Sequence, residues 1–430
     1  MQAVSVNASS FPIHSLWYNQ DMKHKRTRLR MDRVLLLAGS VLLLLFLAVM
    51  AVRAVFFSDT GPRPTAAGQG LDSTRNQTGK TQRVSVTATG DILLEEPLLN
   101  TFGSGSWQDC LADIDPLLAA DDLTIANMEV PIGGEELGIT GIDYSFNAPA
   151  RTAQNLKDHS IEFVSLANNH AADRGTQGIL NTHRNLDEAG IGHTGTFGSQ
   201  EERNQTNVVT VNGMDIAIVS WTYDTNQPYD QEWQVNSFYS PDSAQSQVLL
   251  EDVRRARQQA DAVIVCMHWG TEFTYGLNDA QRILGPQIAQ AGADVIIGNH
   301  PHTIQPAEWI ETDGRKTLCL WSLGNFLSSA YQVDRADETF QDMYEVGALA
   351  AFDLVPGASG VRVENTRIIP IVNHFEGEYE SFRLMKLKDY TEELAAAHSQ
   401  RRFSDLFRKD WLVQQVHEVF DPSGIDLELD

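Results

Sequence analysis

Residues that can bind a metal follow a short apolar run late in this 430-residue sequence. His300 and His302 flank Pro301, directly after the β-branched run Val295–Ile297 and Gly298. Neutral imidazoles bind transition metals, and a proline stiffens the turn that carries them. A strand that ends in this way would place both rings at the carboxyl edge of a sheet, where open α/β folds bind ligands. A polar turn with two solvated histidines is the alternative interpretation.

Other apolar runs end in the same manner. Polar residues with oxygen or nitrogen donors stand directly after the runs 84–89, 123–126, 163–167 and 262–267: Asp91, Glu129, Asn168, Asn169, His170 and His268. A single such residue has a simpler explanation, because Asp91 could cap a following helix. Five strand ends of this kind in one chain instead favour a metal site. Mixed oxygen and nitrogen donors suit a divalent transition metal (Mn, Fe or Zn) better than calcium.

The segments between these runs carry helical patterns, at 153–159, 178–189 and 244–259. Strands that alternate with helices predict an α/β fold with a largely parallel sheet. The carboxyl ends of parallel strands share one edge of the sheet. We therefore expect the polar strand ends to converge within a few ångströms of one another.

Composition excludes some classes of protein. The formal net charge of −25 argues against nucleic acid as a partner, since its phosphates would be repelled. An apolar content of 42% is normal for a chain with a proper core. Three cysteines are too few for a disulfide framework, and Cys266 and Cys319 stand in apolar runs typical of core positions.

The N-terminal part predicts a membrane anchor. Residues 1–33 contain six Lys and Arg residues and are expected to be a cytoplasmic tail, while the nineteen residues 34–52 carry no charge. This length can span a bilayer, so residues 34–57 are expected to be a transmembrane anchor. The positive-inside rule then places the rest of the chain outside the cytoplasm, as a single-pass protein of the cell membrane. A cleaved signal peptide is the alternative.

Domain boundaries follow from composition. Residues 58–83 are rich in Gly, Pro, Ser, Thr, Asn and Gln and predict a flexible linker. A folded domain is expected over residues 84–375. Residues 376–430 combine alternating charge with helical apolar spacing at 394–407 and 411–420, which predicts a helical C-terminal appendage.

Six motifs in order carry a family resemblance: Gly90-Asp91, Asn127-Met128-Glu129, Asn168-Asn169-His170, His268-Trp269-Gly270, Asn299-His300-Pro301-His302 and Ser322-Leu323-Gly324-Asn325-Phe326. They resemble the CapA/PgsA family of bacterial capsule and poly-γ-glutamate synthesis proteins, over about residues 84–374. That family is similar to the calcineurin-like metallophosphoesterases. The resemblance implies an α/β sandwich of two β-sheets flanked by helices, here preceded by one transmembrane helix.

The resemblance also implies roles for individual residues. The metal ligands would be Asp91, Glu129, Asn169, His268, His300 and His302. Asn168 and His170 are the candidate catalytic residues, with His170 contacting the leaving group or a phosphate oxygen. The other interpretation of His170 is a residue that only orients the site.

The chain departs from the wider superfamily at three points. Leu93 stands where metallophosphoesterases usually supply a histidine ligand, Glu129 replaces an aspartate, and no acid directly follows His170. One ion, or two unequal ions, are therefore both compatible with the resemblance.

Two functions remain open from the sequence. The first is a membrane-anchored, metal-dependent hydrolase that acts on a phosphoester or an amide of an envelope polymer or its precursor. The second is a non-catalytic assembly or export component for an anionic envelope polymer, with a relic metal site. The resemblance places either one in capsule or poly-γ-glutamate synthesis, with other capsule-synthesis membrane subunits as partners.

Overall fold

The computed structural model describes residues 82–102, 107, 109–142, 145–329, 342–358, 360–377, 379 and 381–429. These residues lie in a compact unit that spans Gly68–Asp430. The predicted tail, the predicted anchor and nearly all of the predicted linker lie outside the described residues. Among the described residues, no helix has both the length and the apolar character needed to cross a membrane.

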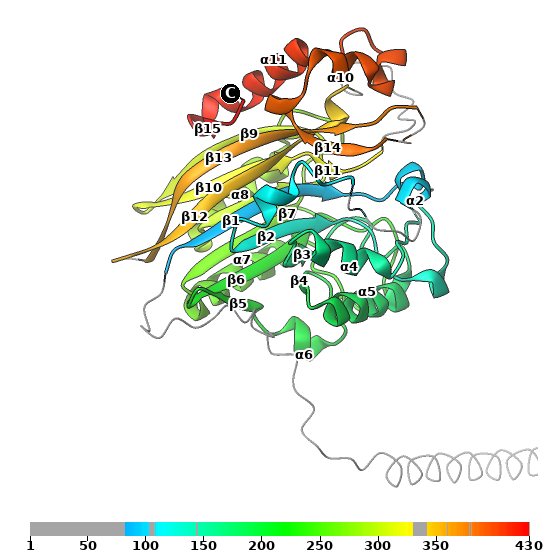
Figure 1. Ribbon diagram of the computed structural model, residues 1–430. Helices are drawn as coiled ribbons and strands as arrows, with labels where there is room; N and C mark the ends of the chain where they lie inside the picture. The colour runs from blue at the N-terminus through cyan, green and yellow to red at the C-terminus, as the bar shows by residue number, and fades with distance from the viewer. Residues whose placement is uncertain are drawn as a thin grey trace, which may run out of the picture. The chain divides into compact units, whose positions relative to one another are not determined.

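One sheet has a parallel half and an antiparallel half, and β1 lies between them (Figure 1). The parallel half consists of β1 (Val84–Ile92), β2 (Leu123–Met128), β3 (Phe163–Ser165) and β4 (Gly192–Thr194). On its other side β1 pairs antiparallel with β12, and the sheet continues through β12 (Val346–Gly357), β13 (Gly360–His374) and β14 (Arg383–Lys386). Two short strands pair parallel with β1 and β13 respectively: β11 (Asn325–Leu327) and β15 (Asp426–Leu427).

The second sheet has a parallel centre and two antiparallel edges. Its strands in spatial order are β5 (Val208–Val211), β6 (Met214–Thr222), β7 (Ala262–His268), β8 (Val295–Asn299), β10 (Arg315–Leu323) and β9 (Ile304–Thr312). The four central strands run parallel, whereas β5 and β9 run antiparallel to their neighbours.

The two sheets pack face to face, and helices cover their outer faces. Ala88 of β1, Ile264 of β7 and Ile297 of β8 belong to one buried cluster between the sheets. The outer face of the first sheet carries α2 (Glu96–Phe102), α3 (Asp115–Leu118), α4 (Arg151–Asp158) and α5 (Gly175–Ala189). The outer face of the second sheet carries α7 (Ala244–Gln259) and α8 (Asp279–Ala291). The expected sandwich of two sheets flanked by helices is confirmed.

Burial on both faces explains why β7 and the first part of β8 are continuous apolar runs. In β7, Ile264 and Cys266 face the other sheet, whereas Val263 and Val265 face the helices. Every second residue therefore contributes to a different core, and no position of the run can be polar until the strand ends. The predicted strands at 84–89, 123–126, 262–267 and 295–297 are confirmed as parts of β1, β2, β7 and β8, whereas the strand predicted at 163–167 is confirmed only over Phe163–Ser165, where β3 ends.

Some helical segments before and after the main helices are short. They are α6 (Gln200–Arg203) and the 3-10 helices η1 (Glu135–Leu137), η2 (Leu387–Asp389) and η4 (Asp421–Ser423).

The C-terminal segment is not purely helical. It contains α10 (Glu392–Ala397), the 3-10 helix η3 (Ser399–Arg402) and α11 (Lys409–Phe420), but also β14 and β15. The helical pattern at 394–407 breaks at His398, whose backbone is extended and whose Nδ1 accepts a hydrogen bond from Gln400 N at 3.0 Å. Leu412 and Phe420 of α11 belong to the core between the sheets, so this segment completes the main fold.

Candidate metal centre

The predicted ligands lie at the carboxyl ends of parallel strands from both sheets. Asp91 stands near the end of β1, in register with Asn127 of β2, and Glu129 follows β2 directly. His268 ends β7 in register with Asn299, the last residue of β8. The sandwich thus brings strand ends that are far apart in sequence to one place, as the sequence predicted.

Two overlapping sets of side chains could each hold a metal ion. Asp91, Glu129 and His268 form one set, and Glu129, His300 and His302 form the other. Within each set, the ligand atoms lie within 4.8 Å of one another. All five side chains are buried, and Glu129 belongs to both sets.

Glu129 is the most unusual group of the five. It is fully buried, and neither of its carboxylate oxygens has a hydrogen-bond partner among the described residues. His268 Nε2 lies 3.3 Å from Oε1 and His302 Nε2 lies 3.6 Å from the same atom. Burial, followed by the neighbouring Asp91 carboxylate, raises the pKa of Glu129 well above its ordinary value.

Asp91 has the opposite surroundings. Asn127 Nδ2 donates to its Oδ1 at 2.7 Å, the His300 backbone N–H donates to its Oδ2 at 3.1 Å, and His302 Nδ1 lies 3.3 Å from Oδ2. Burial acts to raise the pKa of Asp91, but the hydrogen bond and charge of His302 outweigh it and hold the pKa below the ordinary value. The centre therefore contains one well-satisfied carboxylate beside one unsatisfied carboxylate.

The imidazoles of His268 and His300 are neutral. Burial lowers the pKa of His268 to about 3, and burial with the neighbouring His268 lowers the pKa of His300 well below its ordinary value. His268 Nε2 lies 2.8 Å from Asn169 Oδ1, and His268 Nδ1 lies 3.3 Å from Asn127 Nδ2. Neutral imidazole is the form that binds a metal.

The backbone that carries the two histidines of the second set is strained. His300 has φ of 99° and His302 has φ of 56°, in the left-handed region that side chains with a Cβ disfavour. Such conformations cost of the order of 1–3 kcal/mol each and persist where surrounding contacts hold them. The bond from His300 N to Asp91 and the 3.0 Å contact of His302 Nδ1 with Asn325 Oδ1 supply two of those contacts.

The two candidate catalytic residues lie in a turn that begins just after β3. His170 Nδ1 lies 2.8 Å from Asp173 Oδ2, and the same oxygen accepts the backbone N–H of Phe146 at 2.8 Å. Asn168 is engaged by backbone, since Nδ2 donates to Met128 O at 2.8 Å and Oδ1 accepts from His170 N at 3.1 Å. Asn168 thus ties the turn to β2 and positions His170.

Sequence reasoning did not assign four residues that contact the predicted ones. They are Asn127, Asp173, Asn226 and Asn325. Asn127 and Asn325 stand inside the quoted motifs, and Asp173 follows His170 by three residues. The sequence therefore contained a signal for these three positions. Asn226 lies 56 residues from His170 in a loop with no motif.

Leu93 also has a clear place. Its side chain is buried in the cluster that faces the helices of the first sheet, with 5% exposure. The position where the resemblance expects a histidine ligand therefore contributes to the outer core.

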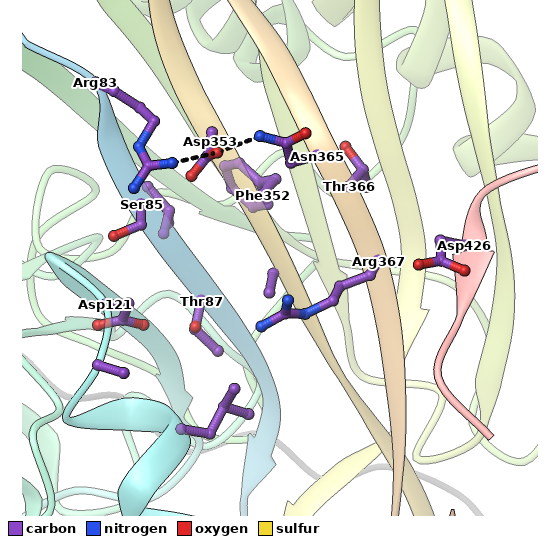
Figure 2. A pocket seen from close by; sticks show the side chains of 14 residues that line it. Arg83, Ser85, Thr87, Asp121, Phe352, Asp353, Asn365, Thr366, Arg367 and Asp426 are labelled. Atoms are coloured by element: carbon purple, nitrogen blue, oxygen red, sulfur yellow. Dashed lines mark hydrogen bonds and ion pairs between the residues drawn. The ribbon is translucent and has the colours of Figure 1, made fainter. Parts of the chain in front are cut away.

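A separate cleft of about 580 Å³ lies near the beginning of β1 (Figure 2). Arg83 donates to Asp353 at 3.2 Å and Asn365 donates to the same carboxylate at 2.6 Å, and Arg367 points across β12. Thr87, which lines this cleft, is four residues from Asp91, roughly 13 Å along the strand. None of the predicted site residues lines it.

The residues at the strand ends fit a divalent transition metal. A buried carboxylate without a hydrogen-bond donor is costly, and a cation would satisfy it. Carboxylate oxygens together with neutral imidazoles are the donors that Zn, Mn and Fe accept.

Several relatives at the sequence level are named for the synthesis of PGA, capsule or polyglutamine. PGA biosynthesis protein CapA of Bacillus subtilis is 26% identical over 250 residues, which cover 57% of this chain and 63% of that protein. Capsule biosynthesis protein CapA of Bacillus anthracis is 26% identical over 260 residues, which cover 57% of this chain and 60% of that protein. A probable polyglutamine synthesis accessory protein of Mycobacterium tuberculosis is 28% identical over 262 residues, 56% of this chain and 67% of the relative. The match thus spans less than two thirds of each Bacillus relative.

Solved structures show more distant likenesses. A hypothetical protein from Thermus thermophilus has a TM-score of 0.40 at 17% identity, covering 66% of this chain and 98% of that one. The calcineurin-like phosphoesterase YfkN from Bacillus subtilis has a TM-score of 0.35 at 12% identity, covering 68% of this chain and 91% of that one.

A family model also matches this chain. The model described as bacterial capsule synthesis protein PGA_cap matches residues 85–330, more than half of the chain. The matched range contains all the strand ends that form the candidate metal centre. The chain is therefore a member of the bacterial capsule synthesis protein family PGA_cap.

Proposed function

We propose that this chain is a membrane-anchored component of capsule or poly-γ-glutamate synthesis that carries out metal-dependent hydrolysis outside the cytoplasm. Its substrate would be a phosphoester or an amide bond of the envelope polymer or its precursor. Membership in the capsule synthesis family supports the context. The geometry at the strand ends supports the chemistry.

The observation that carries the proposal is the environment of Glu129. Its fully buried carboxylate lies beside His268 and His302, and neither oxygen has a hydrogen-bond partner among the described residues. Asp91, Glu129, His268, His300 and His302 would hold one or two ions, and Asn169 lies against His268. A divalent metal at such a site lowers the pKa of a bound water and polarises a phosphoryl or carbonyl oxygen.

His170 is the group that would move a proton. Asp173 Oδ2 accepts the Phe146 N–H and lies 2.8 Å from His170 Nδ1, so Nδ1 would donate its hydrogen to that oxygen. Nε2 is then the atom that takes up or releases a proton at the reacting bond. Asp173 is a positioning residue, because it fixes the orientation and the tautomer of the ring.

An assembly or export role without chemistry is the second candidate. The observation that favours it is Leu93, which packs in the outer core where a further histidine ligand would stand. Partner subunits of the synthesis machinery are part of both proposals.

Surface polymer in cells tests the proposal. Each variant replaces the natural gene, expression is matched, and capsular polymer is measured. His170→Ala should reduce polymer strongly while the purified chain keeps its metal, because this change removes a proton carrier; the typical loss of rate is about 10²- to 10⁴-fold. His302→Ala should lose both metal and polymer.

A matched histidine serves as the control. His417 is exposed on α11, far along the chain from every strand end of the centre, and His417→Ala should keep wild-type polymer and metal. Normal polymer from both His170→Ala and His302→Ala would contradict the hydrolytic function and favour the assembly role.

A further inference from the structure

The loop between β6 and α7 is bonded directly to the candidate metal centre. Tyr223 N donates to His268 O at 3.0 Å, and Asn226 N donates to Asn169 O at 2.7 Å. The loop returns at Tyr239, whose N–H donates to Tyr223 O at 2.8 Å. The first part of the loop is therefore held against the backbone of two predicted ligands, His268 and Asn169, and its return is held against Tyr223, so the loop forms part of the wall of the site.

Asn226 lies on the open side of His170. Asn226 is exposed to solvent, whereas His170 is only 4% exposed. The distance from Asn226 Nδ2 to His170 Nε2 is 3.4 Å. With Nδ1 of His170 engaged by Asp173, Nε2 is the atom that faces the substrate. A bond that reaches Nε2 therefore lies beside the Asn226 amide.

Three tyrosines extend this wall. The ring of Tyr223 lies 4.6 Å from the ring of His300. The hydroxyl of Tyr229 is 2.8 Å from both Ser237 Oγ and the Tyr239 hydroxyl.

Tyr239 combines backbone strain with exposure. The residue is 51% exposed, and its φ of 57° is an unfavourable conformation for a bulky residue. Strain that places an aromatic ring in solvent, rather than in a core, indicates a contact surface.

The surface formed by Tyr223, Asn226 and Tyr239 offers uncharged groups, although the loop that carries it is acidic. Its donors are an amide and phenols, and the charged side chains of the same loop are all acidic: Asp224, Asp230, Glu232 and Asp242. An anionic polymer is therefore not attracted here by ion pairs. A side-chain amide matches the N–H and C=O groups of an amide bond, and tyrosine rings pack on methylene groups while their hydroxyls remain hydrogen-bonded.

We propose that Tyr223, Asn226 and Tyr239, here named the tyrosine rim, bind the amide-linked backbone of the polymer beside the metal centre. The rim thereby determines which bond of the chain reaches His170. This assignment rests on the proposed function for the polymer's role as substrate, but binding at the rim does not require turnover.

Binding without turnover is the first test. The full chain with His170→Ala is titrated with a γ-linked glutamate hexamer, and the dissociation constant is measured by calorimetry. Adding Asn226→Ala or Tyr239→Ala should weaken binding about 10-fold, as loss of a central contact typically does. Metal content is measured on every sample, so that damage to the centre is recognised.

Two controls define the result. Asn204 and Phe403 are exposed and lie outside the loop, so Asn204→Ala and Phe403→Ala should bind the hexamer as the parent chain does. A polyacrylate oligomer with the same number of carboxylates but no amides should bind at least about 10-fold more weakly than the hexamer, because the rim recognises amides.

Turnover is the second test. The wild-type chain is assayed on the hexamer and on γ-glutamyl-p-nitroanilide, a small amide that cannot span the loop. Tyr239→Ala should lower the ratio of kcat/KM for the hexamer to that for the small amide about 10-fold.

The outcomes separate the two proposals. Absence of hydrolysis of both amides together with rim-dependent hexamer binding would overturn amide hydrolysis as the function and leave the rim standing. Rim variants that bind the hexamer like the parent chain, equal binding of polyacrylate, or no hexamer binding at all would overturn the rim.

Discussion

Glu129 determines the electrostatics of the centre. An isolated ionised carboxylate in a buried site is strongly destabilising, so the group holds either a proton or a cation. Its pKa is raised by burial and by Asp91, which is what a carboxylate placed for a cation is expected to show before the cation binds. The same residue therefore links metal binding to stability.

This linkage predicts a pH dependence. In the metal-free chain the folded state keeps the proton of Glu129 at pH values where the unfolded chain, with a pKa near 4.5, has lost it. Unfolding then releases a proton, so this group's contribution to the free energy of unfolding falls as pH rises above about 4.5. Glu129→Gln should raise the Tm of metal-free protein relative to wild type, and the difference should grow from about pH 5 to about pH 8.

Added metal distinguishes this effect from simple burial. Excess Mn²⁺ should reverse the order of Tm, because only the wild type keeps the shared carboxylate. Glu345 is also buried with a raised pKa but belongs to neither ligand set, so metal should not reverse the effect of Glu345→Gln. A metal-dependent reversal for both variants, or for neither, would contradict the role of Glu129.

The meeting of single residues was predictable where strand ends define them, and their role as metal ligands stays a prediction. Asp91, Glu129, His268, His300 and His302 all meet in the structure because each follows an apolar run. Asparagines are equally common in ordinary turns, so Asn127 and Asn325 could not be distinguished from structural residues. Asn226 was not predictable, because only the folded loop brings it to His170.

At the level of elements, close strand contacts hold the site. A Cβ on Gly298 of β8 would lie 2.0 Å from the backbone oxygen of Trp321 in β10. A Cβ on Gly90 of β1 would lie 2.1 Å from the oxygen of Gly324. Gly90 directly precedes Asp91, and Gly298 stands two residues before His300. The close approach of neighbouring backbones at these glycines therefore fixes the backbone positions of Asp91 and His300.

Replacing one of these glycines tests that constraint. Gly298→Ala should force β8 and β10 apart and lower the free energy of unfolding by about 1–3 kcal/mol, measured by denaturant titration. Gly276→Ala is the matched control, since nothing lies within 4 Å of its Cβ position, and it should change stability by less than about 0.5 kcal/mol. Equal stability of the two variants would show that the approach of β8 and β10 does not restrict the site.

Elements were predictable where the hydrophobic pattern is continuous. The central strands are buried on both faces, and their runs of Val and Ile were read directly. The strands β14 and β15 escaped prediction because they are short and lie within alternating charge, and the break at His398 depends on a side-chain to backbone bond. The presence of two sheets rather than one came from the resemblance, because periodicity does not specify pairing partners.

At the scale of the whole molecule, the family of the chain is established, whereas its orientation in a membrane stays a prediction. The six basic residues before Val34 and the uncharged span after it predict a cytoplasmic N-terminus. Protease added to intact, wall-stripped cells should therefore digest the chain after Ser58. If the domain survives in cells whose known external proteins are digested, the predicted orientation is wrong.

The reaction itself was less accessible from the sequence. A metal-dependent hydrolase and a relic site use the same strand ends, and the choice depends on bound metal and on substrate contacts from loops. The bond from Asn226 to Asn169 and the contact between Tyr223 and His300 are properties of the folded chain.

Metal content of the purified full chain tests the central claim most directly. Plasma mass spectrometry on protein prepared without chelator should find about one or two equivalents of Mn, Fe or Zn per wild-type chain. His170→Ala should keep this amount and His302→Ala should lose most of it. A wild-type chain that binds none of these metals under saturating conditions, or His302→Ala protein with the full wild-type amount, would contradict the account.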